Sequence, residues 1–234
     1  MSVSHIVAMG GGGFSMGDPV LDRYVLDLVD APRPKICLLP TASSAVPLNV
    51  LRFLDAFPAN RFEPTYLDLF NPTVSDVTSF LGEQDVIYVG GGNTANMLAI
   101  WRVHGVDRAL RDAWASGVIC CGISAGGNCW FEASTTDSFL TGHADPLLDG
   151  LGWLPGSFTP HYDGEPARRP ALRNLVASGA LPGGLACDDF AAVHFEGTTL
   201  VEAVAATDGA GVYGVQRDGD QAVETPLQVR RLGR

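Results

Sequence analysis

The sequence predicts an α/β fold built on a mostly parallel sheet with helices on both faces. Short apolar runs alternate along the chain with longer amphipathic segments, which is the pattern of successive βαβ units. The short runs are apolar at consecutive positions, as central parallel strands are when both of their faces are buried. The 234 residues are 46% hydrophobic, and no linker, repeat or low-complexity segment marks a second unit. We therefore expect a single domain over residues 1–234.

The elements follow in order from this pattern. Apolar runs predict strands over residues 5–9, 35–40, 65–69, 85–90 and 118–123. Amphipathic segments predict helices over residues 18–29, 47–57, 74–81, 94–103, 107–116 and 165–177. After Gly183 the residues alternate, which predicts strands over 191–195, 199–205, 211–216 and 223–229, separated by turns such as Asp218-Gly219. We expect these to form antiparallel hairpins on the same sheet, with a hairpin tail at about 211–230.

Charge and composition exclude several classes of function. The net charge is −11, from 26 acidic and 15 basic residues, so the cationic surface that nucleic-acid binding needs is absent. No stretch approaches the roughly 20 apolar residues of a membrane span, and no basic segment followed by an apolar run opens the chain. We expect a soluble, cytoplasmic protein without a nucleic-acid or membrane partner.

The most informative segment is an apolar strand that runs into G-x-S-x-G at residues 122–126. A nucleophile at such a strand-to-helix turn has its hydroxyl exposed at the carboxyl end of the strand. The Ala125 N–H, at the start of the following helix, is then placed to stabilise an oxyanion. A glycine-rich turn that needs only tight geometry is the alternative. The strand before the motif and Gly127 after it favour Ser124 as a catalytic nucleophile.

Five cysteines occur, an odd number, and none forms a C-x-x-C pair. Four lie in or beside apolar runs, so we expect buried free thiols and no zinc site. Cys120, Cys121 and Cys129 are rival nucleophiles by position, but packing explains them better.

A second glycine-rich turn follows the predicted strand at 85–90 and should lie beside Ser124. The peptide N–H of Gly91 or Gly92 could supply the second oxyanion donor. A phosphate cradle is the alternative, but the turn has neither a Walker lysine nor the G-x-G-x-x-G spacing. The glycines at 10–13 also lack that spacing, so we interpret them as a wall of the site or as tight packing.

A serine hydroxyl needs a general base within hydrogen-bond reach. Of the three histidines after Ser124, His161 lies where a short strand-like segment enters a loop, whereas His143 and His194 are typical of solvated or structural positions. The carboxylate that orients the base is expected at the next strand end. There we favour Asp188, and the alternatives are Asp189, Asp137 and Asp163.

Together these motifs resemble the dipeptidase E and cyanophycinase family of serine peptidases. The resemblance rests on residues 90–94, on residues 122–126, on Pro160-His161 and on the Asp188 region. It implies a flavodoxin-like sheet related to class I glutamine amidotransferases, with serine in place of their cysteine. It also implies a triad in the chain order serine, histidine, carboxylate, in which Asp188 stands where well-known members carry glutamate.

The resemblance further implies a substrate and its contacts. Gly91 and Gly92 look like the oxyanion partners of Ala125, and Asn93 of the same turn is a candidate substrate contact. The family's preference for aspartyl dipeptides needs a cation for the substrate carboxylate, and Arg168 or Arg169 lies near the matching helix.

We therefore expect acyl transfer to Ser124, with a small peptide as substrate and neither a metal nor an organic cofactor. An esterase or amidase that uses the same site, and a peptide-binding protein without turnover, are the alternatives. Exposed hairpin edges in the tail would allow a homodimer, because unpaired strand edges are usually covered.

Overall fold

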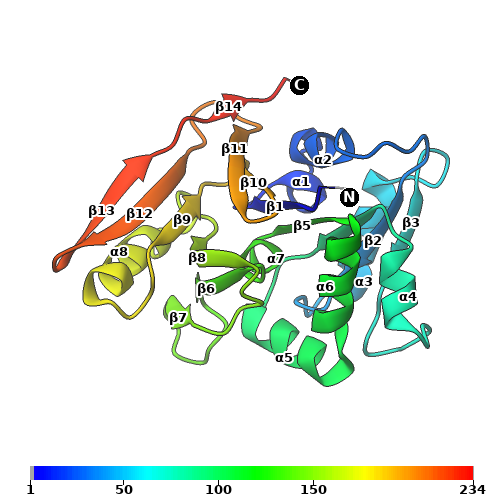
Figure 1. The fold of residues 1–234 in the computed structure, drawn as a ribbon, viewed down its shortest axis with the longest axis horizontal. Coiled ribbons are helices and arrows are strands. Elements are labelled where there is room, and N and C mark those ends of the chain that lie inside the picture. The colour runs from blue at the N-terminus through cyan, green and yellow to red at the C-terminus, as the bar shows by residue number, and fades with distance from the viewer. Residues whose placement is uncertain (1–2, 234) are drawn as a thin grey trace.

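Residues 3–233 are described by the structure, a computed structural model, and they form two β-sheets (Figure 1). The eight-stranded sheet has the order β14-β11-β10-β1-β5-β4-β2-β3. Its strands are β1 (His5–Met9), β2 (Lys35–Leu39), β3 (Glu63–Tyr66), β4 (Val86–Val89), β5 (Ile119–Ile123), β10 (Ala191–Glu196), β11 (Thr199–Ala205) and β14 (Arg230–Arg231). Strands β1, β5, β4, β2 and β3 pair in parallel, which confirms the predicted parallel core.

The six-stranded sheet has the order β13-β12-β9-β8-β6-β7. Its strands are β6 (Phe131–Thr136), β7 (Asp145–Leu147), β8 (Leu154–Thr159), β9 (Gly184–Cys187), β12 (Val212–Asp218) and β13 (Gln221–Pro226). Within it β6, β8 and β9 run parallel, and β12 and β13 form the antiparallel hairpin expected in the tail.

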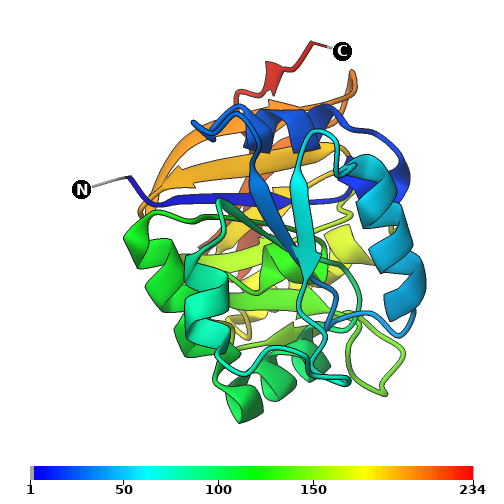
Figure 2. The ribbon, with the colours of Figure 1, turned by 90° about the vertical axis from the view of Figure 1, so that its right-hand side faces the viewer.

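Helices cover both faces of the larger sheet, as Figure 2 shows from the side. They are α1 (Gly13–Met16), α2 (Val20–Leu26), α3 (Val46–Ala56), α4 (Val77–Gly82), α5 (Thr94–His104), α6 (Val106–Ser116), α7 (Ala125–Asn128) and α8 (Arg168–Ser178). Buried residues of α1 to α3 pack on one face, and those of α4 to α6 pack on the other. Helix α8 packs on the smaller sheet, where Leu172 and Val176 meet Ala186 and Val215.

Local sequence signals set the ends of the helices that approach the site. In α5 the Asn93 side-chain oxygen accepts from the Asn96 N–H at 2.8 Å, which caps the first turn. Gly105 ends that helix in the left-handed conformation, with φ of 70°. In α6 the buried Val106, Leu110 and Ala113 recur at helical spacing, so one face of the helix lies on the sheet. Each fully buried apolar side chain of this kind contributes about 1.5–3 kcal/mol.

The prediction that all C-terminal strands join a single sheet is wrong. β10 pairs antiparallel with β1 and β11 pairs antiparallel with β10, so both extend the larger sheet, whereas the β12–β13 hairpin pairs through β12 with β9 of the smaller sheet. The smaller sheet was missed because β6 and β8 are rich in serine and threonine and show no clear alternation. Several of their hydroxyls are paired inside the protein, as in the 3.0 Å contact between Thr135 and Thr159 and the 2.7 Å bond from Ser157 to the Pro182 carbonyl.

Two further observations concern the cysteines and the length of the helices. All five cysteines are buried and free, as predicted. Among residues 3–233, no helix has the length and apolar character that crossing a membrane requires.

Candidate active site

Ser124 stands at the carboxyl end of β5, between the parallel neighbours β1 and β4. Its φ and ψ are 57° and −113°, and it directly precedes α7. The Ser124 N–H donates to the Met9 carbonyl at 3.1 Å, which ties the turn to the end of β1. A positive φ at a residue other than glycine costs on the order of 1–3 kcal/mol and persists where the surrounding structure enforces it. The predicted strand-to-helix turn at Ser124 is therefore present, and its backbone is strained.

The two glycines of G-x-S-x-G are required by close backbone approach. A Cβ on Gly122 would lie 2.4 Å from the Gly126 carbonyl oxygen, and a Cβ on Gly126 would lie 2.2 Å from the Val89 carbonyl oxygen. Because real Cβ atoms essentially never come so close to other atoms, α7 can fold back over β4 and β5 only with glycine at both positions.

Backbone strain is concentrated at this place in the molecule. Among the described residues, three other than glycine have positive φ: Ser124, His161 and Phe190, the last of which directly follows Asp189. The φ values of His161 and Phe190 are 52° and 64°. The three residues come from separate loops, and such strain clusters at functional sites.

His161 is brought to the same strand end by β8, which stops at Thr159. The His161 N–H donates to the Gly10 carbonyl at 3.3 Å, one residue beyond the carbonyl that receives the Ser124 N–H. Its ring Nδ1 lies 2.6 Å from Asp189 Oδ1, and each of these two side chains is 19% exposed. With Nδ1 bonded to a carboxylate, the imidazole keeps its Nε2 available as a base.

Asp188, the preferred candidate for the orienting carboxylate, makes no hydrogen bond to His161, and the carboxylate that bonds to the imidazole is the alternative, Asp189. The Asp188 side chain accepts from the Gly211 N–H at 2.8 Å and from the Tyr213 hydroxyl at 3.4 Å. Burial raises its pKa above the usual value for aspartate. The side chains of adjacent residues in an extended segment point to opposite sides, so Asp188 and Asp189 contact different groups.

The two remaining carboxylate candidates also have other partners. Asp163 accepts from the Asp189 N–H at 2.8 Å and thereby holds the backbone next to the His161–Asp189 pair. Asp137 lies 3.3 Å from Arg168 through its Oδ1 and is 65% exposed.

The glycine-rich loop after β1 leaves room for the His161–Asp189 pair. A Cβ on Gly11 would lie 2.0 Å from Asp189 Oδ1 and 3.1 Å from His161 Nδ1. Gly11 also forms an isolated β-bridge with Asp189, and its carbonyl accepts from the Phe190 N–H at 3.1 Å. This loop is therefore a wall of the candidate site.

The candidate oxyanion donors surround Ser124. Ala125 begins α7, where backbone N–H groups have no partner within the helix. A Cβ on Gly91 would lie 3.8 Å from Ser124 Oγ, so the second glycine-rich turn adjoins the nucleophile. Within residues 3–233, that turn donates from Gly90 to Leu39 and from Asn93 to Ala42, and the N–H groups of Gly91 and Gly92 have no protein acceptor.

Asn93 is occupied by structural contacts. Its side-chain oxygen caps α5, and its Nδ2 donates to the Ser138 carbonyl at 2.9 Å. The contact ties the second glycine-rich turn, residues 90–93, to the loop that follows β6, where Asp137 lies next to Ser138.

The adjacent arginines diverge. Arg168 is only 4% exposed, and its guanidinium contacts Glu165 at 2.6 Å, Asp137 at 3.3 Å and the Thr135 carbonyl at 3.3 Å. Arg169 instead pairs with Glu224 of β13 and lies over the rings of Tyr162 and Tyr213.

Asn128, which was not singled out from the sequence, links three elements of the site. Its Nδ2 lies 3.4 Å from Thr94 Oγ1 at the start of α5 and 3.3 Å from the Thr135 carbonyl of β6. A carbonyl can only accept, so this contact fixes which way the amide points. Its position four residues after Ser124, on the first turn of the following helix, is the sequence signal that could have indicated it.

The rival groups are placed elsewhere or are unreactive. Burial raises the pKa of the Cys120, Cys121 and Cys129 thiols, so these cysteines stay protonated near neutral pH. His194 lies in β10 and bonds to His5 and Tyr24. His143 lies in a loop and is exposed.

Comparison with known proteins agrees with this geometry. The profile of peptidase family S51 matches residues 6–203. The chain is 47% identical to the uncharacterized peptidase YgaJ of Bacillus subtilis, over 99% of this chain and 100% of that protein. It is 33% identical to peptidase E of Streptomyces coelicolor, over 46% of this chain and 47% of that protein.

Two solved structures share the fold. A peptidase from an acI-B1 actinobacterium superposes with a TM-score of 0.66 at 14% identity, covering 96% of this chain and 97% of that one. A candidate peptidase E protein from Listeria monocytogenes superposes with a TM-score of 0.63 at 18% identity, covering 88% of this chain and 100% of that one. Since the family profile spans the strained serine turn and the loop that presents the histidine, the chain belongs to peptidase family S51 and is a serine peptidase.

Proposed function

We propose that this peptidase hydrolyses dipeptides or other short peptides through an acyl-enzyme on Ser124. His161 serves as the general base, and Asp189 holds the imidazole in the required tautomer. The observation that carries the proposal is the convergence of three strained loops at the end of β1, with His161 Nδ1 and Asp189 Oδ1 only 2.6 Å apart.

Peptide hydrolysis proceeds in two stages, acylation of Ser124 and hydrolysis of the acyl-enzyme. His161 Nε2 takes the proton of Ser124 Oγ as the oxygen attacks the peptide carbonyl carbon, and the carbonyl oxygen becomes an oxyanion. The N–H groups of Ala125 and of Gly91 or Gly92 stabilise that oxyanion. The imidazolium then gives its proton to the leaving amine as the C–N bond breaks. In the second half, His161 takes a proton from water as the water oxygen attacks the ester carbonyl carbon. The imidazolium then returns that proton to Ser124 Oγ as the ester C–O bond breaks, which releases the acid and restores both residues.

We further infer that Arg168, rather than Arg169, serves an aspartyl substrate. Arg169 is held by Glu224 and by two aromatic rings, whereas Asp137, the partner of Arg168, is 65% exposed. A substrate aspartyl carboxylate has the same chemistry as Asp137 and could replace it on the guanidinium. This supports hydrolysis of Asp-X dipeptides.

The test is a dipeptide panel of Asp-X, Glu-X, Asn-X and Ala-X, assayed with the wild-type protein and with Ser124→Ala. Ser124→Ala should abolish cleavage with an unchanged Tm, and a fluorophosphonate probe should label the wild-type protein only. Full activity of Ser124→Ala would refute the mechanism. Arg168→Gln should remove any preference of Asp-X over Asn-X, while the matched variant Arg169→Gln keeps it. Equal wild-type rates on Asp-X and Asn-X would refute the aspartyl specificity alone.

The same experiments separate the competing functions. Faster turnover of acyl esters than of every dipeptide would indicate an esterase or amidase. Saturable peptide binding without labelling of Ser124 would indicate a binding protein.

A further inference from the structure

A cavity of about 500 Å³ adjoins the glycine-rich turn that follows β4, and Arg168 is not among its lining residues. Its walls come from the loop after β2, which contributes Thr41 and Ser44, from Phe70, from Gly92, and from the first turns of α5, which contribute Asn96 and Ile100. Pockets that bind small ligands have volumes of roughly 300–1,000 Å³, so this one can hold an amino-acid side chain with part of its backbone.

The cavity is bordered by the same glycine-rich turn that adjoins the nucleophile. Gly92 lines it, and a Cβ on the preceding Gly91 would lie 3.8 Å from Ser124 Oγ. Gly92 has φ of 137°, and a Cβ there would lie 2.2 Å from the Ala42 carbonyl oxygen. The turn and the loop after β2 therefore pack backbone against backbone, and the wall of the cavity is continuous with the candidate oxyanion site.

The lining of this cavity carries no charged side chain. Thr41 Oγ1 accepts from the Trp101 indole N–H at 3.1 Å, which leaves the hydroxyl hydrogen of Thr41 able to donate. Phe70 is 61% exposed and offers an apolar ring. The amide of Asn96 can both donate and accept.

The charged groups near the site do not line this cavity. Asn93 lines it, and its Nδ2 donates at 2.9 Å to the carbonyl of Ser138, the residue that follows Asp137. Asp137, its partner Arg168 and Glu165 are not among the lining residues, so the cavity is uncharged although charged groups lie in the neighbouring loop and helix.

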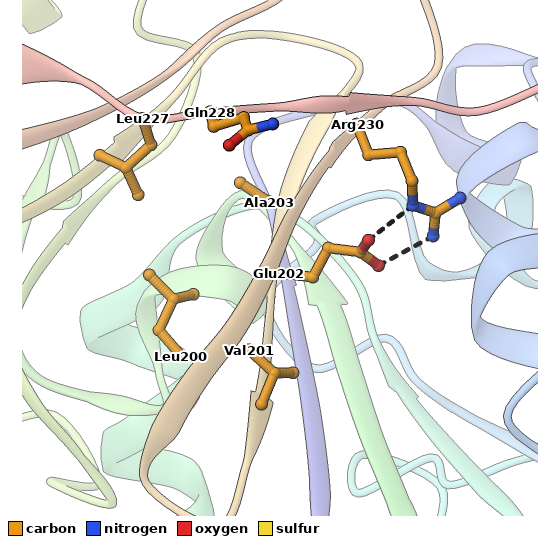
Figure 3. A pocket seen from close by; sticks show the side chains of 7 residues that line it. All are labelled: Leu200, Val201, Glu202, Ala203, Leu227, Gln228 and Arg230. Carbon is orange, nitrogen blue, oxygen red and sulfur yellow. Dashed lines mark hydrogen bonds and ion pairs between the residues drawn. The ribbon is translucent and has the colours of Figure 1, made fainter.

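Other cavities lack this relation to the nucleophile. The one drawn in Figure 3 has a volume of about 520 Å³ and lies between β11 and residues 227–230. Its charged groups, Glu202 and Arg230, neutralise each other through two hydrogen bonds of 2.5 and 2.8 Å. None of the residues that line it belongs to the candidate active site.

The geometry points to this cavity as the subsite for the residue that follows the scissile bond, with selectivity for an uncharged side chain at that position. The inference rests on the proposed function and adds to it the class of leaving residue. An uncharged polar or aromatic side chain meets hydroxyl, amide and apolar groups there, whereas a charged one loses hydration and finds no counter-ion.

The test varies the second residue of a dipeptide, which leaves as the free amine. The first residue is kept constant and is the one found in the dipeptide that the wild-type protein hydrolyses best. Gln, Phe, Glu and Lys occupy the second position, and kcat/KM is measured for each. Gln and Phe should exceed Glu and Lys by about fivefold, because a charged side chain loses part of its hydration in the cavity and meets no counter-ion there.

Charge substitutions on the cavity wall give the decisive arm. Asn96→Lys should raise the ratio of kcat/KM for Glu over Lys by about two- to fivefold, and Asn96→Asp should lower it by a similar factor. Ser44→Lys and Ser44→Glu, on the opposite wall, should act in the same two directions. Asn60→Lys and Asn60→Asp, at an exposed turn outside the lining, are matched controls that should leave the ratio unchanged.

The outcomes separate this inference from the proposed function. If all variants hydrolyse the panel and none of the four wall substitutions changes the ratio, the subsite is overturned while the peptidase mechanism stands. If the wild-type protein cleaves no dipeptide in any series, both are overturned. Opposite shifts with opposite charges, absent from the Asn60 controls, establish the subsite.

Discussion

Exchanging each of the adjacent aspartates for asparagine tests which one orients the base. In Asp189→Asn the new amide either accepts weakly from His161 Nδ1–H or donates to Nδ1. A donating amide places the imidazole proton on Nε2, where it blocks transfer from Ser124. The contact is 2.6 Å long and involves one carboxylate oxygen, so we expect the variant to lose most of the control that Asp189 has over the tautomer of His161. The equivalent loss in serine peptidase triads is about 10⁴-fold, so kcat/KM should fall by about 10³–10⁴.

Asp188→Asn is the matched control at the neighbouring position. Its partners are the Gly211 N–H and the Tyr213 hydroxyl, and an amide oxygen can still accept from both. We expect kcat/KM to change by less than about tenfold, since no contact with His161 is lost. Removal of the acceptor in Asp188→Ala should lower the free energy of unfolding by about 1–3 kcal/mol, because a buried donor is left unpaired.

Steady-state hydrolysis of the best dipeptide, with Tm as the test of folding, decides between the two carboxylates. A loss of 10³-fold or more in Asp188→Asn, with near wild-type rates in Asp189→Asn, would refute the assignment of Asp189 drawn from the hydrogen bonds.

Three further predictions concern neighbouring groups. Gly11→Ala places a Cβ 2.0 Å from Asp189 Oδ1, so the carboxylate must move and kcat should fall by about 10²-fold or more in steady-state assays. The fluorophosphonate probe should still label Ser124 in this variant. Burial raises the pKa of Asp22 to about 7, so the folded protein holds this proton more tightly than the unfolded chain does. The free energy of unfolding should therefore decline by up to about 4 kcal/mol as the pH rises from 4 to 8. Asp22→Asn should flatten that decline in pH-dependent thermal melts. Asn128→Ala should lower kcat more than it raises KM, because it frees the start of α5 from the helix of the nucleophile.

Much of the larger sheet could be predicted from the sequence because its central strands are continuous apolar runs. The expected segments 5–9 and 199–205 coincide with β1 and β11. The expected strand at 65–69 is shifted, and β3 covers Glu63–Tyr66, because the edge strand is exposed or half-buried and its pattern is weak. Ser124 could be found from the G-x-S-x-G spacing, since glycine is required there by backbone contacts within a few residues.

The remainder depended on contacts that sequence patterns do not encode. β6 and β8 are buried although they carry Ser and Thr, and contacts such as the Thr135–Thr159 hydroxyl pair and the bond from Ser157 to the Pro182 carbonyl satisfy part of this buried polarity. The choice between Asp188 and Asp189 depends on which side of an extended segment faces β8. The split between Arg168 and Arg169 likewise depends on the position of α8 between β6 and the β12–β13 hairpin.

The site draws its parts from both sheets, and this has a consequence for catalysis. Ser124 and the glycine-rich turn belong to the larger sheet, His161 follows β8 of the smaller sheet, and Asp189 lies in the connection from β9 to β10 that joins the two. The elbow is held by its own contacts with β1 and β4, so displacement of the smaller sheet would move the base away from a nucleophile that stays in place. Substitutions that disturb β8 or β9 should therefore lower turnover while the elbow keeps its geometry, whereas substitution of Gly122 or Gly126 should destroy the elbow itself.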